Sequence, residues 1–159
     1  MKAYRKGGIG ALMDEYERAT AELKILVEQT PDDDYIQVLD ARTKDEDCRT
    51  IQTILTHVVR SGFGYANYIR DSFSIPTTRS ITGLLSRQEA VVGLDEVLGY
   101  TAQTLEGKWE MTDEEIEAVA IQSRWGVTYT LEQLLEHAIV HILRHRRQIE
   151  RLLQESRSV

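Results

Sequence analysis

The amphipathic stretch from Thr130 to Gln154 limits most strongly how this chain can fold. A helix turns about 100° per residue, and on that wheel the apolar side chains of the stretch fall within roughly 60° of one direction. The stretch therefore predicts a long helix with one buried face. The Thr130-x-x-Gln133 pattern is a capping box that marks its beginning. The residues of the buried face are Leu131, Leu134, Leu135, Ala138, Ile142, Ile149, Leu152 and Leu153.

Three histidines recur every four residues along this helix, so they lie on one slanting stripe. His145 falls inside the apolar arc, His141 about 80° from its centre, and His137 about 120° from it, which predicts that His137 looks outward. Two imidazoles at positions i and i+4 can share one cation about 2 Å from each ring nitrogen. In the alternative interpretation, His145 makes a hydrogen bond across the core and His141 belongs to an amphipathic surface.

The rest of the chain also shows helical periodicity, broken by short polar connections. Residues 32–47 are acidic and aperiodic, apart from Tyr35–Leu39, which could be a short strand or an ordered loop, and we assign them as a connection. No repeat or strand-rich region is present, so the sequence predicts an all-α four-helix bundle with a short extra helix before the last long one, in one domain over residues 1–159. The expected helices span residues 9–28, 47–73, 86–106, 112–121 and 130–154.

The charge balance narrows the functional class. A net charge of −7 disfavours a general nucleic-acid binder, which needs a clustered excess of Lys and Arg. One local exception is a set of arginines late in the last helix, expected to form a solvated face near the negative end of the helix dipole, with anion binding as the alternative. The arginines are Arg144, Arg146, Arg147 and Arg151.

Cys48 is the only cysteine, and no apolar run could span a bilayer, so we expect a cytoplasmic protein without a membrane partner.

The remaining histidine, His57, lies on the second predicted helix. It is about 120° from Ile51, at the border of the apolar arc, where a side chain faces a cleft. Ser61 and Tyr68 follow along the same edge, and we select them as candidates for substrate contact, with plain packing as the alternative for each.

Two segments resemble a known family. Residues 54–59 read ILTHVV, and residues 137–149 read HAIVHILRHRRQI, preceded by WGVTYTL at 125–131. Together they resemble the DinB/YfiT-like superfamily of metalloenzymes, small four-helix bundles with a histidine midway along the second helix and a last helix of roughly His-x-x-x-His-x-x-x-His-Arg-x-Gln-Ile. The resemblance implies a divalent metal held by His57, His141 and His145, with His137 as an outer position. Many relatives have a histidine where Arg144 stands here and a small residue at the position of Arg147.

Three imidazoles from two helices, without a carboxylate or a thiolate, would leave at least one coordination position open, as in catalytic metal sites. Such a donor set suits Zn, Ni or Fe(II). A bound cation would lower the pKa of water from about 15.7 towards 7, or bind and activate a thiolate. Gln148, one turn beyond His145, could orient a ligand or the bound water, or could be an ordinary rim residue.

Characterised relatives in this family include thiol S-transferases that use bacillithiol, mycothiol or a similar thiol, a thiol-dependent isomerase, and proposed metal-dependent hydrolases. The resemblance therefore implies an enzyme that transfers a thiol or water to a small electrophilic substrate, with a low-molecular-weight thiol as a cosubstrate. The alternative is a non-catalytic helical bundle that serves as a binding or dimerisation module, because bundles associate through exposed helix faces, and a homodimer is expected. A third possibility is a histidine-lined bundle without a metal.

Overall fold

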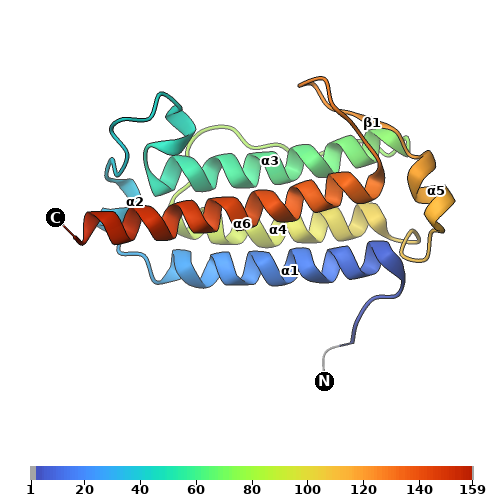
Figure 1. Cartoon of the computed structure of the whole chain (residues 1–159), viewed down its shortest axis with the longest axis horizontal. Coiled ribbons are helices and arrows are strands. Elements are labelled where there is room, and N and C mark those ends of the chain that lie inside the picture. The colour runs from blue at the N-terminus through green and yellow to red at the C-terminus, as the bar shows by residue number, and fades with distance from the viewer. Residues whose placement is uncertain (1–2, 159) are drawn as a thin grey trace.

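The computed structural model describes residues 3–158 and confirms a helical bundle (Figure 1). Short elements join the long helices: the helices α2 (Asp32–Ile36) and α5 (Asp113–Ala118), the 3-10 turn η1 (Glu46–Cys48), and an antiparallel hairpin of β1 (Ile121–Gln122) and β2 (Thr128–Tyr129). The long helices are α1 (Gly7–Glu28), α3 (Ile51–Ser72), α4 (Arg87–Leu105) and α6 (Leu131–Ser156).

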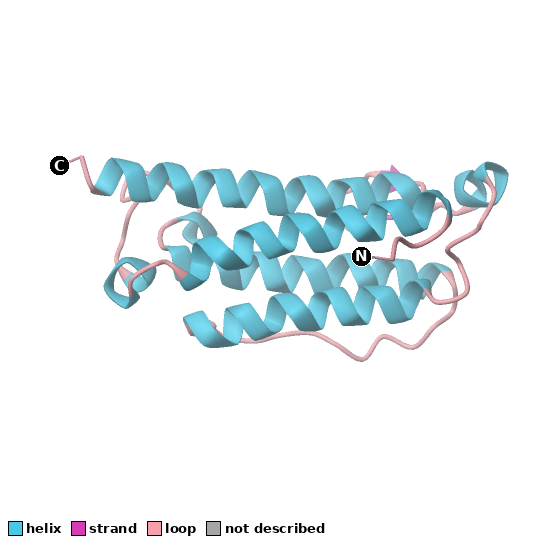
Figure 2. Cartoon of the chain, turned by 90° about the horizontal axis from the view of Figure 1, so that it is seen from below, coloured by secondary structure: helices cyan, strands magenta, loops and turns pink. Residues whose placement is uncertain are grey.

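Each long helix packs against two others: α1 and α3 both contact α4 and α6. The segment between α3 and α4 runs back along the length of the bundle, so that these two neighbours point the same way (Figures 1 and 2). It is fastened to the helices by hydrogen bonds, among them the backbone N–H of Leu85 to the Thr56 hydroxyl at 3.0 Å. This topology brings the middle of α3 against the middle of α6.

The predicted apolar face of the last helix is confirmed, since every residue assigned to it is buried. The predicted capping box is also present at the beginning of α6, where the Thr130 side chain accepts from the backbone N–H of Gln133 at 3.2 Å. His141 and His145 are buried with this face. The helix that forms the core therefore also carries two imidazoles into the interior.

The parallel pair α3 and α4 approaches closely at two glycines. A Cβ on Gly62 would lie 2.6 Å from Cγ1 of Val97, and one on Gly93 would lie 2.9 Å from Cγ1 of Val59. Both distances are too short for a real side chain, so the absence of a Cβ permits this packing.

Three predicted boundaries were wrong. Residues 32–36, assigned to a connection, form α2, whose Tyr35 is buried and donates its hydroxyl to the carbonyl of Leu85 at 3.1 Å. The second helix begins at Ile51 rather than residue 47, because Thr50 caps it. The short helix ends at Ala118, and residues 121–122 form β1.

Within residues 3–158, every helix is too short or too polar to cross a membrane.

Candidate metal centre

The structure brings His57 of α3 together with His141 and His145 of α6. Nε2 of His141 lies 3.0 Å from Nε2 of His57 and 3.2 Å from Nε2 of His145. One ligand atom from each of the three residues lies within 4.8 Å of the others. Two imidazole nitrogens on one tetrahedral ion, each about 2.0–2.1 Å from it, would be about 3.3 Å apart. The observed spacing is therefore compatible with one shared cation.

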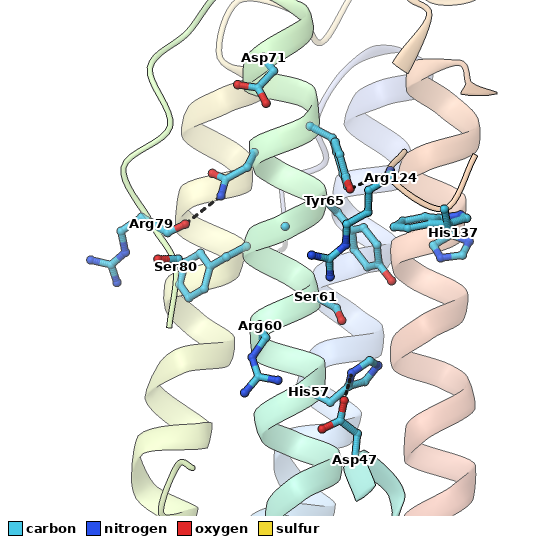
Figure 3. A pocket seen from close by; sticks show the side chains of 15 residues that line it. Asp47, His57, Arg60, Ser61, Tyr65, Asp71, Arg79, Ser80, Arg124 and His137 are labelled. Atoms are coloured by element: carbon cyan, nitrogen blue, oxygen red, sulfur yellow. Dashed lines mark hydrogen bonds and ion pairs between the residues drawn. The ribbon is translucent and has the colours of Figure 1, made fainter. Parts of the chain in front are cut away.

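A carboxylate lies behind His57. Asp47, on η1, places Oδ2 3.3 Å from Nδ1 of the His57 ring (Figure 3). A carboxylate can only accept, so this contact favours a proton on Nδ1 and leaves the lone pair of Nε2 directed at the cluster. Carboxylates behind metal-binding histidines commonly set the ring tautomer in this way.

Gln148 has the same role behind His145. Its Oε1 lies 2.8 Å from Nδ1 of His145, and because an amide oxygen can only accept, Nδ1 carries the proton. The sequence left two roles open for Gln148: orienting a ligand or the bound water, or lying at the rim as an ordinary residue. In the structure its amide contacts the ring of His145.

With Nδ1 protonated on two rings, the cluster holds more lone pairs than protons. Nε2 of His57 and Nε2 of His145 both present lone pairs to Nε2 of His141, which can donate only one proton. Three nitrogens gathered in this way repel one another unless a cation lies between them. The chemistry of this donor set therefore fits a metal ion.

Two of the three imidazoles are shielded from solvent. His141 is 6% exposed and His145 8%. Burial, reinforced by the neighbouring imidazoles of His145 and His57, lowers the pKa of His141 to about 2. Burial also lowers the pKa of His145, against an opposing effect of Gln148. Both rings are thus neutral at pH 7, which is the form that binds metals.

His137 stays outside this cluster, in agreement with its expected outer position, but it does not look outward into solvent. It is half-buried, with its ring stacked on Trp125 at 5.9 Å between centroids and edge-on to Tyr65 at 5.3 Å. The hairpin turn before β2 carries Trp125 over this face of α6. A helical wheel of α6 could not predict that Trp125 covers His137, because the hairpin turn that carries Trp125 lies outside this helix.

A cavity of about 580 Å³, here called the aromatic cavity, extends from His57 along α3 to the hairpin (Figure 3). Ser61 and Tyr68, the predicted substrate contacts, both line it, as does His137. The Tyr68 hydroxyl accepts from the backbone N–H of Arg124 at 3.1 Å. The cavity walls include Phe63, Tyr65, Tyr68 and Trp125.

A second cavity of about 520 Å³, here called the arginine cavity, is lined by all three clustered histidines. His57 is the residue that the linings of both cavities share. Cys48 also lines the arginine cavity, and burial raises the pKa of its thiol, so the sulfur is protonated at neutral pH. The cavity is further lined by Asp45, Arg144, Arg147, Gln148 and Arg151.

Sequence reasoning missed Asp47 and Cys48, which belong to residues assigned to an acidic connection or to the start of a helix. Neither residue is marked by a spacing relative to His57. The available signal was the Thr50-x-x-Thr53 capping pattern, which indicates that the helix begins after residue 50. The residues before Thr50 then belong to a separate turn that can fold back beside the helix.

Comparison with known proteins agrees with this architecture. The model of the DinB family matches residues 4–156. A solved structure of a DinB-like protein from Bacillus subtilis is similar to this chain, with 17% identity, a TM-score of 0.60 and 92% of each chain covered. At that identity the likeness concerns the fold. No curated protein sequence matches the chain.

Proposed function

Because the chain belongs to the DinB family, we propose that it is a metal-dependent enzyme that transfers a thiol or water to a small electrophilic substrate. His57, His141 and His145 bind a divalent transition metal in this proposal. The donor set favours Zn, Ni or Fe(II) over Mg or Ca, because imidazole is a poor match for hard cations.

One observation carries the proposal: three Nε2 atoms converge while two of the rings are held from behind. Asp47 and Gln148 fix the Nδ1 side of His57 and His145, so the lone pairs have a set direction before any ligand arrives. Partners on Nδ1 would also satisfy structural histidines, so the convergence of the three Nε2 atoms is the feature that favours a metal. The histidines also line cavities, as an enzyme site requires.

A bound ion of this kind supplies a nucleophile at neutral pH by lowering the pKa of a coordinated water or thiol. The protein's own residues do the rest. The aromatic cavity binds the electrophile against apolar ring faces and keeps water away from it. Ser61, Tyr68 and His137 are the polar groups proposed to contact that substrate.

Tyr65 adds a hydrogen-bond donor to the same wall. Burial raises the pKa of its hydroxyl to about 12, against an opposing effect of the Ser61 hydroxyl, so Tyr65 keeps its proton at neutral pH. A protonated phenol can donate to an oxygen of the electrophile on which negative charge develops.

The decisive experiment is elemental analysis of freshly purified protein by plasma mass spectrometry. We expect about one equivalent of a transition metal in the wild type, its loss in His141→Ala, and its retention in His137→Ala, which is the matched control on the same helix. Full metal occupancy in His141→Ala would overturn the assignment.

Catalysis needs a separate assay. The metal-loaded protein is incubated with a thiol and a chloroaromatic or an epoxide, and adducts are measured by mass spectrometry. Adduct formation that depends on His141 supports the enzyme. No turnover across several thiols and metals would favour the alternative, a non-catalytic binding or dimerisation module. The homodimer stays a prediction, to be checked by sedimentation.

A further inference from the structure

We propose that the arginine cavity binds an oxyanion, a carboxylate or a phosphate, of the molecule that reacts at the metal centre, and that Arg144 and Arg147 hold it. This inference rests on the proposed function and deepens it, because it assigns a chemical class to one of the two reactants.

Helix α6 contributes both metal-binding histidines and arginines to the arginine cavity. Arg144 immediately precedes His145, and Arg147 follows one turn after Arg144, so both guanidinium groups line the cavity that the three histidines line. An anionic molecule held there would have its remaining atoms beside the cluster of Nε2 atoms.

These two arginines differ from their neighbours in having no counter-ion. Arg146 pairs with Glu22 and Glu150, and Arg151 pairs with Glu155. Among residues 3–158, no carboxylate lies within ion-pair distance of Arg144 or Arg147. Both side chains are exposed at the cavity that the three histidines line, so their donors are free to bind a ligand beside the cluster.

The carboxylate that lines the arginine cavity, that of Asp45, already accepts hydrogen bonds from its own turn. Asp45 accepts the backbone N–H of Asp47 at 3.0 Å and the thiol of Cys48 at 3.5 Å, both within its own turn. With Arg151 paired to Glu155, the unpaired positive charges of Arg144 and Arg147 exceed the single negative charge of Asp45.

Guanidinium is suited to this task because its planar, fork-shaped donors match two oxygens of a carboxylate or a phosphate. At about 520 Å³ the cavity has the size of a small-molecule site. The two cavities differ in chemistry, since only the aromatic cavity has tyrosine, phenylalanine and tryptophan walls, and only the arginine cavity is lined by all three clustered histidines. His57 lines both, so an apolar electrophile and an anionic partner could reach the centre from different sides.

The test is isothermal titration of the metal-free protein with malonate in one arm and inorganic phosphate in the other. Removing the metal leaves the arginines as the source of affinity. We expect the wild type to bind at least one probe, and Arg144→Gln and Arg147→Gln each to weaken it about tenfold, the effect of losing one charge-assisted contact at an exposed site. The probe that binds more tightly identifies the oxyanion.

The matched control is Arg18→Gln, which removes the same charge from the exposed surface of α1, outside the cavity. We expect it to bind like the wild type. Equal affinity in all variants, or no binding of either probe, would overturn the inference. Metal content measured on each preparation before the metal is removed separates the two failures: a freshly purified wild type without metal overturns the proposed function, whereas unchanged anion affinity in the cavity variants overturns the role of the arginines.

Discussion

Oδ2 of Asp47 lies 3.3 Å from Nδ1 of His57, although the two residues belong to different elements. On one continuous helix they would be about 15 Å apart, at 1.5 Å per residue. Thr50 caps α3, and the chain before it turns back as η1 beside the first turns of the helix. A local capping interaction thus gives the candidate metal centre its carboxylate.

Replacing Asp47 with Ala should weaken metal affinity about 10- to 100-fold, as loss of a carboxylate behind a histidine ligand typically does. His57 would keep its place on α3 but lose the partner that fixes its tautomer. Competition with a chromophoric chelator measures the effect. Glu46→Ala is the matched control, because Glu46 is on the same turn and pairs with Arg49 instead. Equal affinities in the two variants would contradict the role of Asp47.

The histidine cluster was predictable because it depends on helical periodicity. Four-residue spacing placed His141 and His145 on one face, and the wheel placed His57 at the edge of a cleft. Each of these features belongs to a single helix, and the cluster forms once α3 and α6 pack side by side. The family resemblance supplied the pairing of α3 with α6, which periodicity alone does not determine.

The contacts that were missed come from turns. Asp47 reaches His57 through the bend before α3, and Trp125 covers His137 through the hairpin. The backbone path of a turn depends on a few dihedral angles that hydrophobic periodicity does not report. Gln148 was found by its spacing from His145, but its amide could not be assigned to the ring or to a ligand without coordinates.

Metal binding should stabilise the folded state. A ligand at 100 times its Kd adds about 2.7 kcal/mol to the free energy of unfolding, which for a domain of this size raises Tm by about 5–10 °C. Thermal unfolding of metal-free protein, with and without added Zn²⁺ or Ni²⁺, checks this. His141→Ala should show no increase. A wild-type Tm that does not respond to any of these metals would contradict the expectation.

The metal-free protein should lose stability as the pH falls below about 6.5. The pKa of His141 drops from 6.5 to about 2 on folding, so in this range the unfolded state binds a proton that the folded state rejects. Stability then falls with decreasing pH, by up to about 1.4 kcal/mol per pH unit for each such proton. Urea unfolding between pH 7.5 and 5.5 measures the slope. His141→Gln should flatten it, and identical slopes would refute the assignment.

Two glycines in α3 should respond oppositely to the same substitution. A Cβ on Gly62 would lie 2.6 Å from Val97, whose branched side chain has little freedom to move, so Gly62→Ala should lower the free energy of unfolding by about 1–3 kcal/mol. A Cβ on Gly64 would meet no atom within 4 Å, so Gly64→Ala should raise it by about 0.5–1 kcal/mol, because alanine restricts the unfolded chain. Urea unfolding at pH 7.5 compares the two variants with the wild type. A rise with Gly62→Ala would mean that α3 and α4 do not approach as closely as Gly62 and Val97 indicate, and a fall with Gly64→Ala would contradict the open space beside Gly64.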